Sequence, residues 1–172
     1  MTIIVSPLIY VDAVMRARRP SHLISLLDPD HIQTIRTPVD LSTERHLRLG
    51  VSDICDPIEG LVIPEEEHVL QILAFGRDWN ETNPMLVHCW AGVSRSTATA
   101  FVLACERNPE TPELEIAWRM RRSAGHAHPN RRIVWLADDL LGRGGRMVDA
   151  VEAIGGGDSY AEGVPFDLPA RF

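Results

Sequence analysis

The 172-residue sequence lacks three features, each of which would point to a particular class of protein. Its three cysteines are an odd number without a C-x-x-C spacing, which argues against a disulfide framework or a zinc knuckle. No run approaches the roughly 20 apolar residues that span a bilayer. The N-terminus has neither the basic region nor the small-residue cleavage site of a secretory signal. We therefore expect reduced thiols, a cytoplasmic location and no membrane partner.

Positive charge is also scarce in this chain. Lysine and arginine number 17 against 24 aspartates and glutamates, which gives a formal net charge of −7. A chain with this balance repels polyanions, so nucleic acid and anionic membrane surfaces are poor candidates as principal partners. Any anion that the protein binds must therefore be held by a local site.

The hydrophobic pattern predicts an α/β fold. Short apolar runs bounded by Pro, Asp, Ser or Gly predict strands at 3–5, 22–27, 47–51 and 85–88. Amphipathic patterns predict helices at 64–79, 94–106, 111–122, 129–141 and 147–154. This order predicts a central, mostly parallel sheet of about four to five strands flanked by helices, with a helical C-terminal half.

The chain length fits one domain, which we expect over residues 1–154. Residues 155–172 are rich in Gly and Pro and predict an irregular tail. Phe166 and Leu168 are the residues expected to dock this tail on the domain.

The stretch LVHCWAGVSRSTATAF, residues 86–101, predicts an anion-binding loop between a strand and a helix. Small residues let backbone N–H groups turn inward, and the following helix adds the partial positive charge of its N-terminus. Gly92 is the residue best able to take an unusual backbone conformation. The planar fork of Arg95 suits two oxygens of a phosphate group. The candidate phosphate-binding residues are Trp90, Ala91, Gly92, Val93, Ser94 and Arg95.

Cys89 lies where this loop begins, and the same donors favour its thiolate form. A thiolate beside a bound phosphate is a nucleophile for phosphorus, and a phosphocysteine divides one hydrolysis into two easier steps. Ser96 is placed to hydrogen-bond the sulfur and help it leave. His88 precedes the cysteine on the strand, so we expect its side chain to point into the fold and support the thiol.

His88, Cys89, Gly92, Arg95 and Ser96 fall on the pattern H-C-x-x-G-x-x-R-S/T. Through this motif the sequence resembles the cysteine-dependent protein tyrosine phosphatases, particularly the small dual-specificity type, over roughly residues 20–141. The resemblance implies hydrolysis of a phosphorylated protein or a small phosphomonoester without a metal or another cofactor. The short length and plain composition favour a stand-alone bacterial member, and they leave the oligomeric state open.

The resemblance also implies a general acid, normally an aspartate upstream of the cysteine. Asp53 and Asp56 are the two candidates, in the stretch VSDICDPIEG. Asp53 is favoured because it ends a predicted strand and Pro57 follows four residues later, but Asp56 remains the alternative. Between them stands Cys55, which could form a reversible disulfide with Cys89 if this loop closes over the pocket.

Two further residues carry expectations from the resemblance. Asn130 matches a Pro-Asn turn and should line the pocket rim. Trp90 stands where members that act on highly anionic lipids carry a basic residue, which argues against a phosphoinositide substrate. The alternatives are a phosphate-binding module of the same fold with weak or no turnover, and a phosphatase of a non-protein ester.

Overall fold

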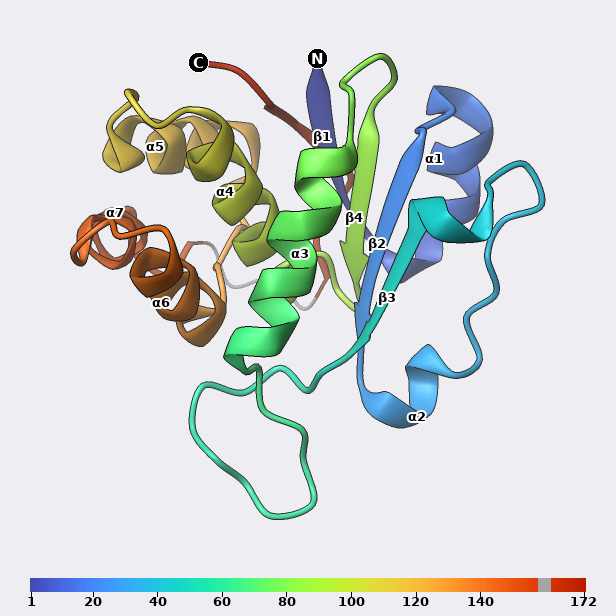
Figure 1. Ribbon diagram of the computed structural model, residues 1–172, viewed down its shortest axis with the longest axis horizontal. Helices are drawn as coiled ribbons and strands as arrows, with labels where there is room; N and C mark the ends of the chain where they lie inside the picture. Colours follow the sequence, from blue (N-terminus) through green and yellow to red (C-terminus); the bar gives the residue numbers. More distant parts are fainter. Residues whose placement is uncertain (158–161) are drawn as a thin grey trace.

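A five-stranded sheet forms the centre of the computed structural model, which describes residues 1–157 and 162–172 (Figure 1). The spatial order of the strands is β3-β2-β4-β1-β5. Strands β1 to β4 run parallel to one another, whereas β5 is antiparallel to its neighbour β1. The strands are β1 (Thr2–Pro7), β2 (His22–Leu27), β3 (His46–Gly50), β4 (Met85–Cys89) and β5 (Phe166–Pro169). The predicted α/β class and mostly parallel sheet are confirmed.

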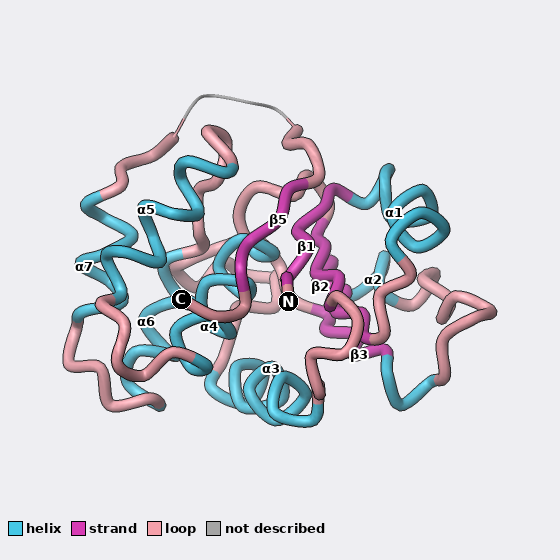
Figure 2. The backbone as a smooth tube through the Cα atoms, turned by 90° about the horizontal axis from the view of Figure 1, so that it is seen from above, coloured by secondary structure: helices cyan, strands magenta, loops and turns pink. Residues whose placement is uncertain are grey.

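Helices cover both faces of this sheet (Figure 2). Helix α1 packs on one face, where Val11 and Val14 join a small apolar cluster with residues of the strands. The larger core lies on the other face, beneath α3 to α7. The helices are α1 (Val11–Arg18), α2 (Pro29–Ile32), α3 (Glu66–Asp78), α4 (Arg95–Arg107), α5 (Glu113–Ser123), α6 (Arg131–Leu140) and α7 (Arg146–Ala153). No helix in the described part of the chain is long and apolar enough to cross a membrane.

Helix α4 is the central helix of the larger core. Every residue from Arg95 to Cys105 is buried, because α4 lies between the sheet and the helices α3, α5 and α6. Its alanines and threonines are small enough to let these neighbours approach closely. A Cβ atom added at Gly76 of α3 would lie 2.3 Å from Leu103 Cδ2, so glycine at this crossing lets the Leu103 side chain pack directly on the backbone of α3. This packing on several sides holds the N-terminus of α4 in place relative to the sheet.

The tail predicted to be irregular is ordered in its last part. Residues 158–161 lie outside the described residues, but Phe166–Pro169 forms β5, paired with β1 from Thr2↔Pro169 to Val5↔Phe166. Phe166 and Leu168 are buried, as expected for the two docking residues. The prediction of irregular structure was wrong here because a four-residue strand next to proline carries little periodic signal.

Candidate active site

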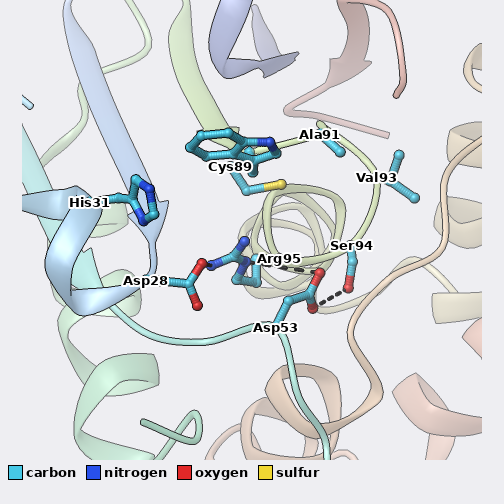
Figure 3. A pocket seen from close by; sticks show the side chains of 9 residues that line it. Asp28, His31, Asp53, Cys89, Ala91, Val93, Ser94 and Arg95 are labelled. Carbon is cyan, nitrogen blue, oxygen red and sulfur yellow. Dashed lines mark hydrogen bonds and ion pairs between the residues drawn. The ribbon is translucent and has the colours of Figure 1, made fainter. Parts of the chain in front are cut away.

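A hollow of about 510 Å³ lies at the edge of the sheet where the parallel strands β2 and β4 end (Figure 3). In open α/β sheets ligands bind at this carboxyl edge. The residues that line the hollow come from α2, from the segments that follow β2 and β3, from the end of β4, and from the loop that leads into α4 together with the first residue of α4. They are Asp28, His31, Asp53, Cys89, Trp90, Ala91, Val93, Ser94 and Arg95.

The carbonyl groups of the loop between β4 and α4 are bound from outside the hollow. Trp90 O accepts from Leu8 N at 3.1 Å, and Ala91 O accepts from Gly163 N at 2.8 Å. Val93 O accepts from His128 N at 2.9 Å. Another such bond joins Ser94 O to Asn130 N at 3.3 Å. None of the four donor residues lines the hollow.

These bonds orient the amide groups of the loop. In a trans peptide the C=O and the N–H point in opposite directions, and the described residues contain no cis peptide. Because the carbonyls point outward, the N–H groups that follow them point toward the hollow. Among the described residues no protein acceptor takes the N–H of Ala91, Gly92 or Ser94. The loop therefore has several N–H groups free to bind an anion.

Gly92 gives the loop its shape. Its φ is +70°, a conformation that side chains rarely adopt, and a Cβ atom there would lie 2.6 Å from Pro7 N. The loop can therefore pass this close to the end of β1 only with glycine at position 92.

Arg95 opens α4 and is buried, with 4% of its surface exposed. Its Nη1 donates to Val51 O at 2.7 Å and to Asp28 Oδ2 at 3.4 Å. Its Nε is buried and makes no hydrogen bond with the described residues, since Asp53 Oδ2 lies 3.9 Å away. A buried guanidinium donor without an acceptor is costly unless a ligand supplies one. Val51 and Asp28 thus hold the side chain through Nη1, while Nε and Nη2, which have no hydrogen bond to the described residues, remain for an anion.

Cys89 lies at the end of β4, with its sulfur in the hollow beside the N-terminus of α4 (Figure 3). Ser96 is also buried, in the first turn of α4, and its Oγ lies 3.1 Å from Cys89 Sγ. The structure therefore brings Cys89, Arg95 and Ser96 together around one point. The strand, loop and helix predicted for this motif are all present.

The two candidate acids lie in different places. Asp53 lines the hollow with Cys89, and its Oδ1 accepts from Ser94 Oγ at 2.6 Å and from Asn130 Nδ2 at 2.9 Å. Asp56 and Cys55 line a separate hollow next to Arg131 and Trp135. This placement favours Asp53 for chemistry at Cys89, and it does not bring Cys55 to Cys89.

Asn130 connects three parts of the site. Its Oδ1 caps α6 by accepting from Ile133 N at 3.1 Å, while its Nδ2 holds Asp53. Its backbone N–H is the donor to Ser94 O described above. The prediction that Asn130 lines the pocket rim was wrong, because its side chain is turned to Asp53 and to the start of α6, and it contacts the site from outside the hollow.

His88 points into the fold, as expected, and is fully buried. Its Nε2 lies 2.6 Å from Ser25 Oγ, which in turn lies 2.9 Å from His46 Nε2. Burial lowers the pKa of His88 from 6.5 to about 4 and that of His46 likewise to about 4. Both rings are therefore neutral at physiological pH, and His88 does not line the hollow.

Sequence reasoning missed two residues of the hollow. Asp28 follows β2 and pairs with Arg95, and His31 lies in α2 with its ring 5.0 Å from that of Trp90. Trp90 is 51% exposed, so the two rings form an aromatic wall at the mouth. The described residues contain no cluster of three or more His, Cys, Asp or Glu side chains able to hold a metal.

Comparisons with known proteins identify the fold. No protein-family model and no curated protein sequence matches the chain. Among solved structures, the crystal structure of DUSP15, a dual-specificity phosphatase, is similar with a TM-score of 0.61 and 18% sequence identity. The match covers 87% of this chain and 88% of DUSP15. The chain therefore has the fold of a dual-specificity phosphatase.

Proposed function

We propose that this protein hydrolyses phosphomonoesters through a phosphocysteine intermediate, as a protein phosphatase of the tyrosine or dual-specificity type. The observation that carries the proposal is that the buried Arg95 Nε has no hydrogen-bond acceptor among the described residues. Arg95 lines the same hollow as Cys89, next to a loop whose N–H groups point inward. Donors that converge in this way fit the three non-bridging oxygens of a phosphoryl group. The fold, shared with a dual-specificity phosphatase, agrees with this chemistry.

In the first step the thiolate of Cys89 attacks phosphorus, and the bond from phosphorus to the ester oxygen breaks. The loop N–H groups and the Arg95 guanidinium bind the non-bridging oxygens, whose charge they stabilise. Asp53 donates a proton to the departing oxygen, so that the alcohol or phenol leaves neutral.

In the second step a water molecule attacks phosphorus and the S–P bond breaks. Asp53, now a carboxylate, takes the proton from this water. The hydroxyl of Ser96, 3.1 Å from the sulfur, donates a hydrogen bond to the thiolate as it leaves. Inorganic phosphate is released and Cys89 is ready for another cycle.

The mouth of the hollow supports an aryl phosphate on a protein as substrate. Trp90 and His31 line the mouth with aromatic rings that a phenyl group can pack against. Asp28 adds negative charge at the rim, which disfavours substrates with several phosphates. Within this proposal a bacterial origin and a cytoplasmic location stay predictions, as do the absence of cofactors and of nucleic-acid or membrane partners.

The test is hydrolysis of p-nitrophenyl phosphate by the purified protein and by two variants. Cys89→Ser should leave less than about 1% of the turnover while tungstate, a tetrahedral oxyanion, still binds, because the loop donors and Arg95 remain. Arg95→Lys should lose both turnover and affinity, since an ammonium cannot reproduce the bidentate fork. If the unmodified protein binds tungstate without hydrolysing the ester, the protein is instead a phosphate-binding module.

A further inference from the structure

We propose that the C-terminal segment, residues 162–170, positions the loop of residues 90–94 between β4 and α4, which we call the phosphate loop. The segment acts on this loop through Gly163. The proposal rests on the proposed function only in that the loop binds a tetrahedral oxyanion. It concerns a part of the chain that lies outside the motif and that the sequence analysis treated as a tail.

The link is the hydrogen bond from Gly163 N to Ala91 O, at 2.8 Å. Ala91 O and the N–H of Gly92 belong to one peptide unit and point in opposite directions. By holding the carbonyl outside the hollow, Gly163 holds the Gly92 N–H toward it. A hydrogen bond to the carbonyl also polarises the peptide, which strengthens its N–H as a donor.

The fit around Gly163 explains why the link needs glycine. Gly163 is buried, and a Cβ atom there would lie 2.5 Å from both Cδ2 and Nε2 of His126 and 3.3 Å from Ala91 O. The ring of His126 is itself buried and packs edge-on against Phe166, with the ring centroids 5.6 Å apart. A side chain at position 163 would therefore push the segment away from the loop.

Strand β5 gives the link a rigid base. Phe166 pairs with Val5 of β1, and Leu168 is fully buried against the larger core. Beyond the strand, Asn108 Nδ2 donates to Ala170 O at 2.9 Å and Ala170 N donates to Met1 O at 3.0 Å. Groups held by strands keep a functional geometry better than groups on free loops do. Strand β5 lies at the edge of the sheet beside β1 (Figure 2), and from there the segment fixes the peptide between Ala91 and Gly92.

The test is the affinity of the full chain for tungstate, measured by calorimetry, with p-nitrophenyl phosphate kinetics beside it. Gly163→Ala should raise the Kd for tungstate about five- to tenfold, as expected for losing one properly aimed donor. It should lower kcat/KM for p-nitrophenyl phosphate at least as much. Met147→Ala is the control: it removes a buried side chain of α7, outside this segment and away from the lining of the hollow. It should lower the melting temperature and leave the Kd at the wild-type value below the transition.

A double-mutant cycle of Gly163→Ala and His126→Ala tests whether the loss of affinity comes from the clash between the new Cβ atom and the His126 ring. His126→Ala opens space for the new Cβ, so Gly163→Ala should cost much less affinity in that background than in the wild type. The proposal is overturned if Gly163→Ala binds tungstate within twofold of the wild type. It is also overturned if Met147→Ala weakens binding equally, or if the cycle shows no coupling.

A measurement on the unmodified protein covers the case in which Gly163→Ala does not fold. Saturating tungstate should slow hydrogen exchange of the Gly163 amide, because an anion at the Gly92 N–H strengthens the bond on the other side of the peptide. Unchanged exchange at Gly163, with tungstate bound, would overturn the proposal. Failure of the proposed function looks different: tungstate binding depends on Gly163, but no ester is hydrolysed.

Discussion

Asp53 and Asp56 stand three residues apart, yet only Asp53 shares a hollow with Cys89. We predict that Asp53→Asn lowers kcat about 10²-fold or more for phenyl phosphate, whose leaving oxygen needs a proton. The loss should be much smaller for an ester of an acidic phenol, which departs as a stable anion. Steady-state kinetics on both esters measure the contrast. Asp56→Asn is the matched control, and a leaving-group dependence in that variant alone would identify Asp56 as the acid.

Ser96 contacts the sulfur directly, at 3.1 Å, from within the helix that follows the loop. Its hydroxyl should matter most when the thiolate leaves phosphorus, so Ser96→Ala should slow the second step more than the first. We predict a burst of p-nitrophenol in stopped-flow experiments with this variant and none with the wild type. Unchanged turnover without a burst would remove Ser96 from the mechanism.

Some residues of the site are neighbours in the sequence, whereas others are brought together only by the order of the strands. Cys89, Arg95 and Ser96 were predictable because one strand, loop and helix bring them together within eight consecutive residues. Asp28 and His31 were not, because they follow β2, and only the strand order shows that β2 lies beside β4. Local periodicity carries no information about which strands are neighbours.

Three adjacent strands are joined inside the sheet by the hydrogen bonds of Ser25 on β2, His46 on β3 and His88 on β4. In the folded protein burial lowers the pKa of His88 from 6.5 to about 4, so the unfolded chain binds a proton there that the folded chain does not. The free energy of unfolding should therefore be unaffected by His88 above pH 6.5 and fall as the pH drops from 6.5 to 4. For this one histidine the loss is about 3 kcal/mol.

Urea denaturation between pH 7.5 and 4.5 measures this loss. His88→Gln is the control, because it removes the titrating ring and should make the decline with falling pH shallower. Equal slopes in the two proteins would mean that His88 is not buried in its neutral form.

The helices and strands also differ in whether the sequence alone predicts them. The four parallel strands and the five helices from α3 to α7 were predictable, because each carries its own apolar pattern. Helix α1 was missed, since only Val11 and Val14 of its eight residues are buried. Strand β5 was missed because its place is set by the open edge of β1, which no feature of residues 166–169 reveals.

Across the whole molecule, the phosphate loop is fastened by segments from distant parts of the chain. Leu8 follows β1, His128 and Asn130 precede α6, and Gly163 precedes β5. The motif brings Cys89 and Ser96 together, but the rest of the fold determines where its peptide groups point. The residues that hold the loop therefore cannot be found from the motif alone.

The pairing of β1 with β5 also sets an order of events in folding. Thr2 and Leu168, 166 positions apart, are joined by a hydrogen bond, and contacts of such long range form slowly because a large loop must close first. Helices α3 to α7 depend on nearer partners. We predict that after dilution from urea the helical circular dichroism signal recovers before tungstate binding does, whereas equal rates would contradict this. Tungstate binding would then show when β5 has paired with β1, whereas the helical circular dichroism signal would not.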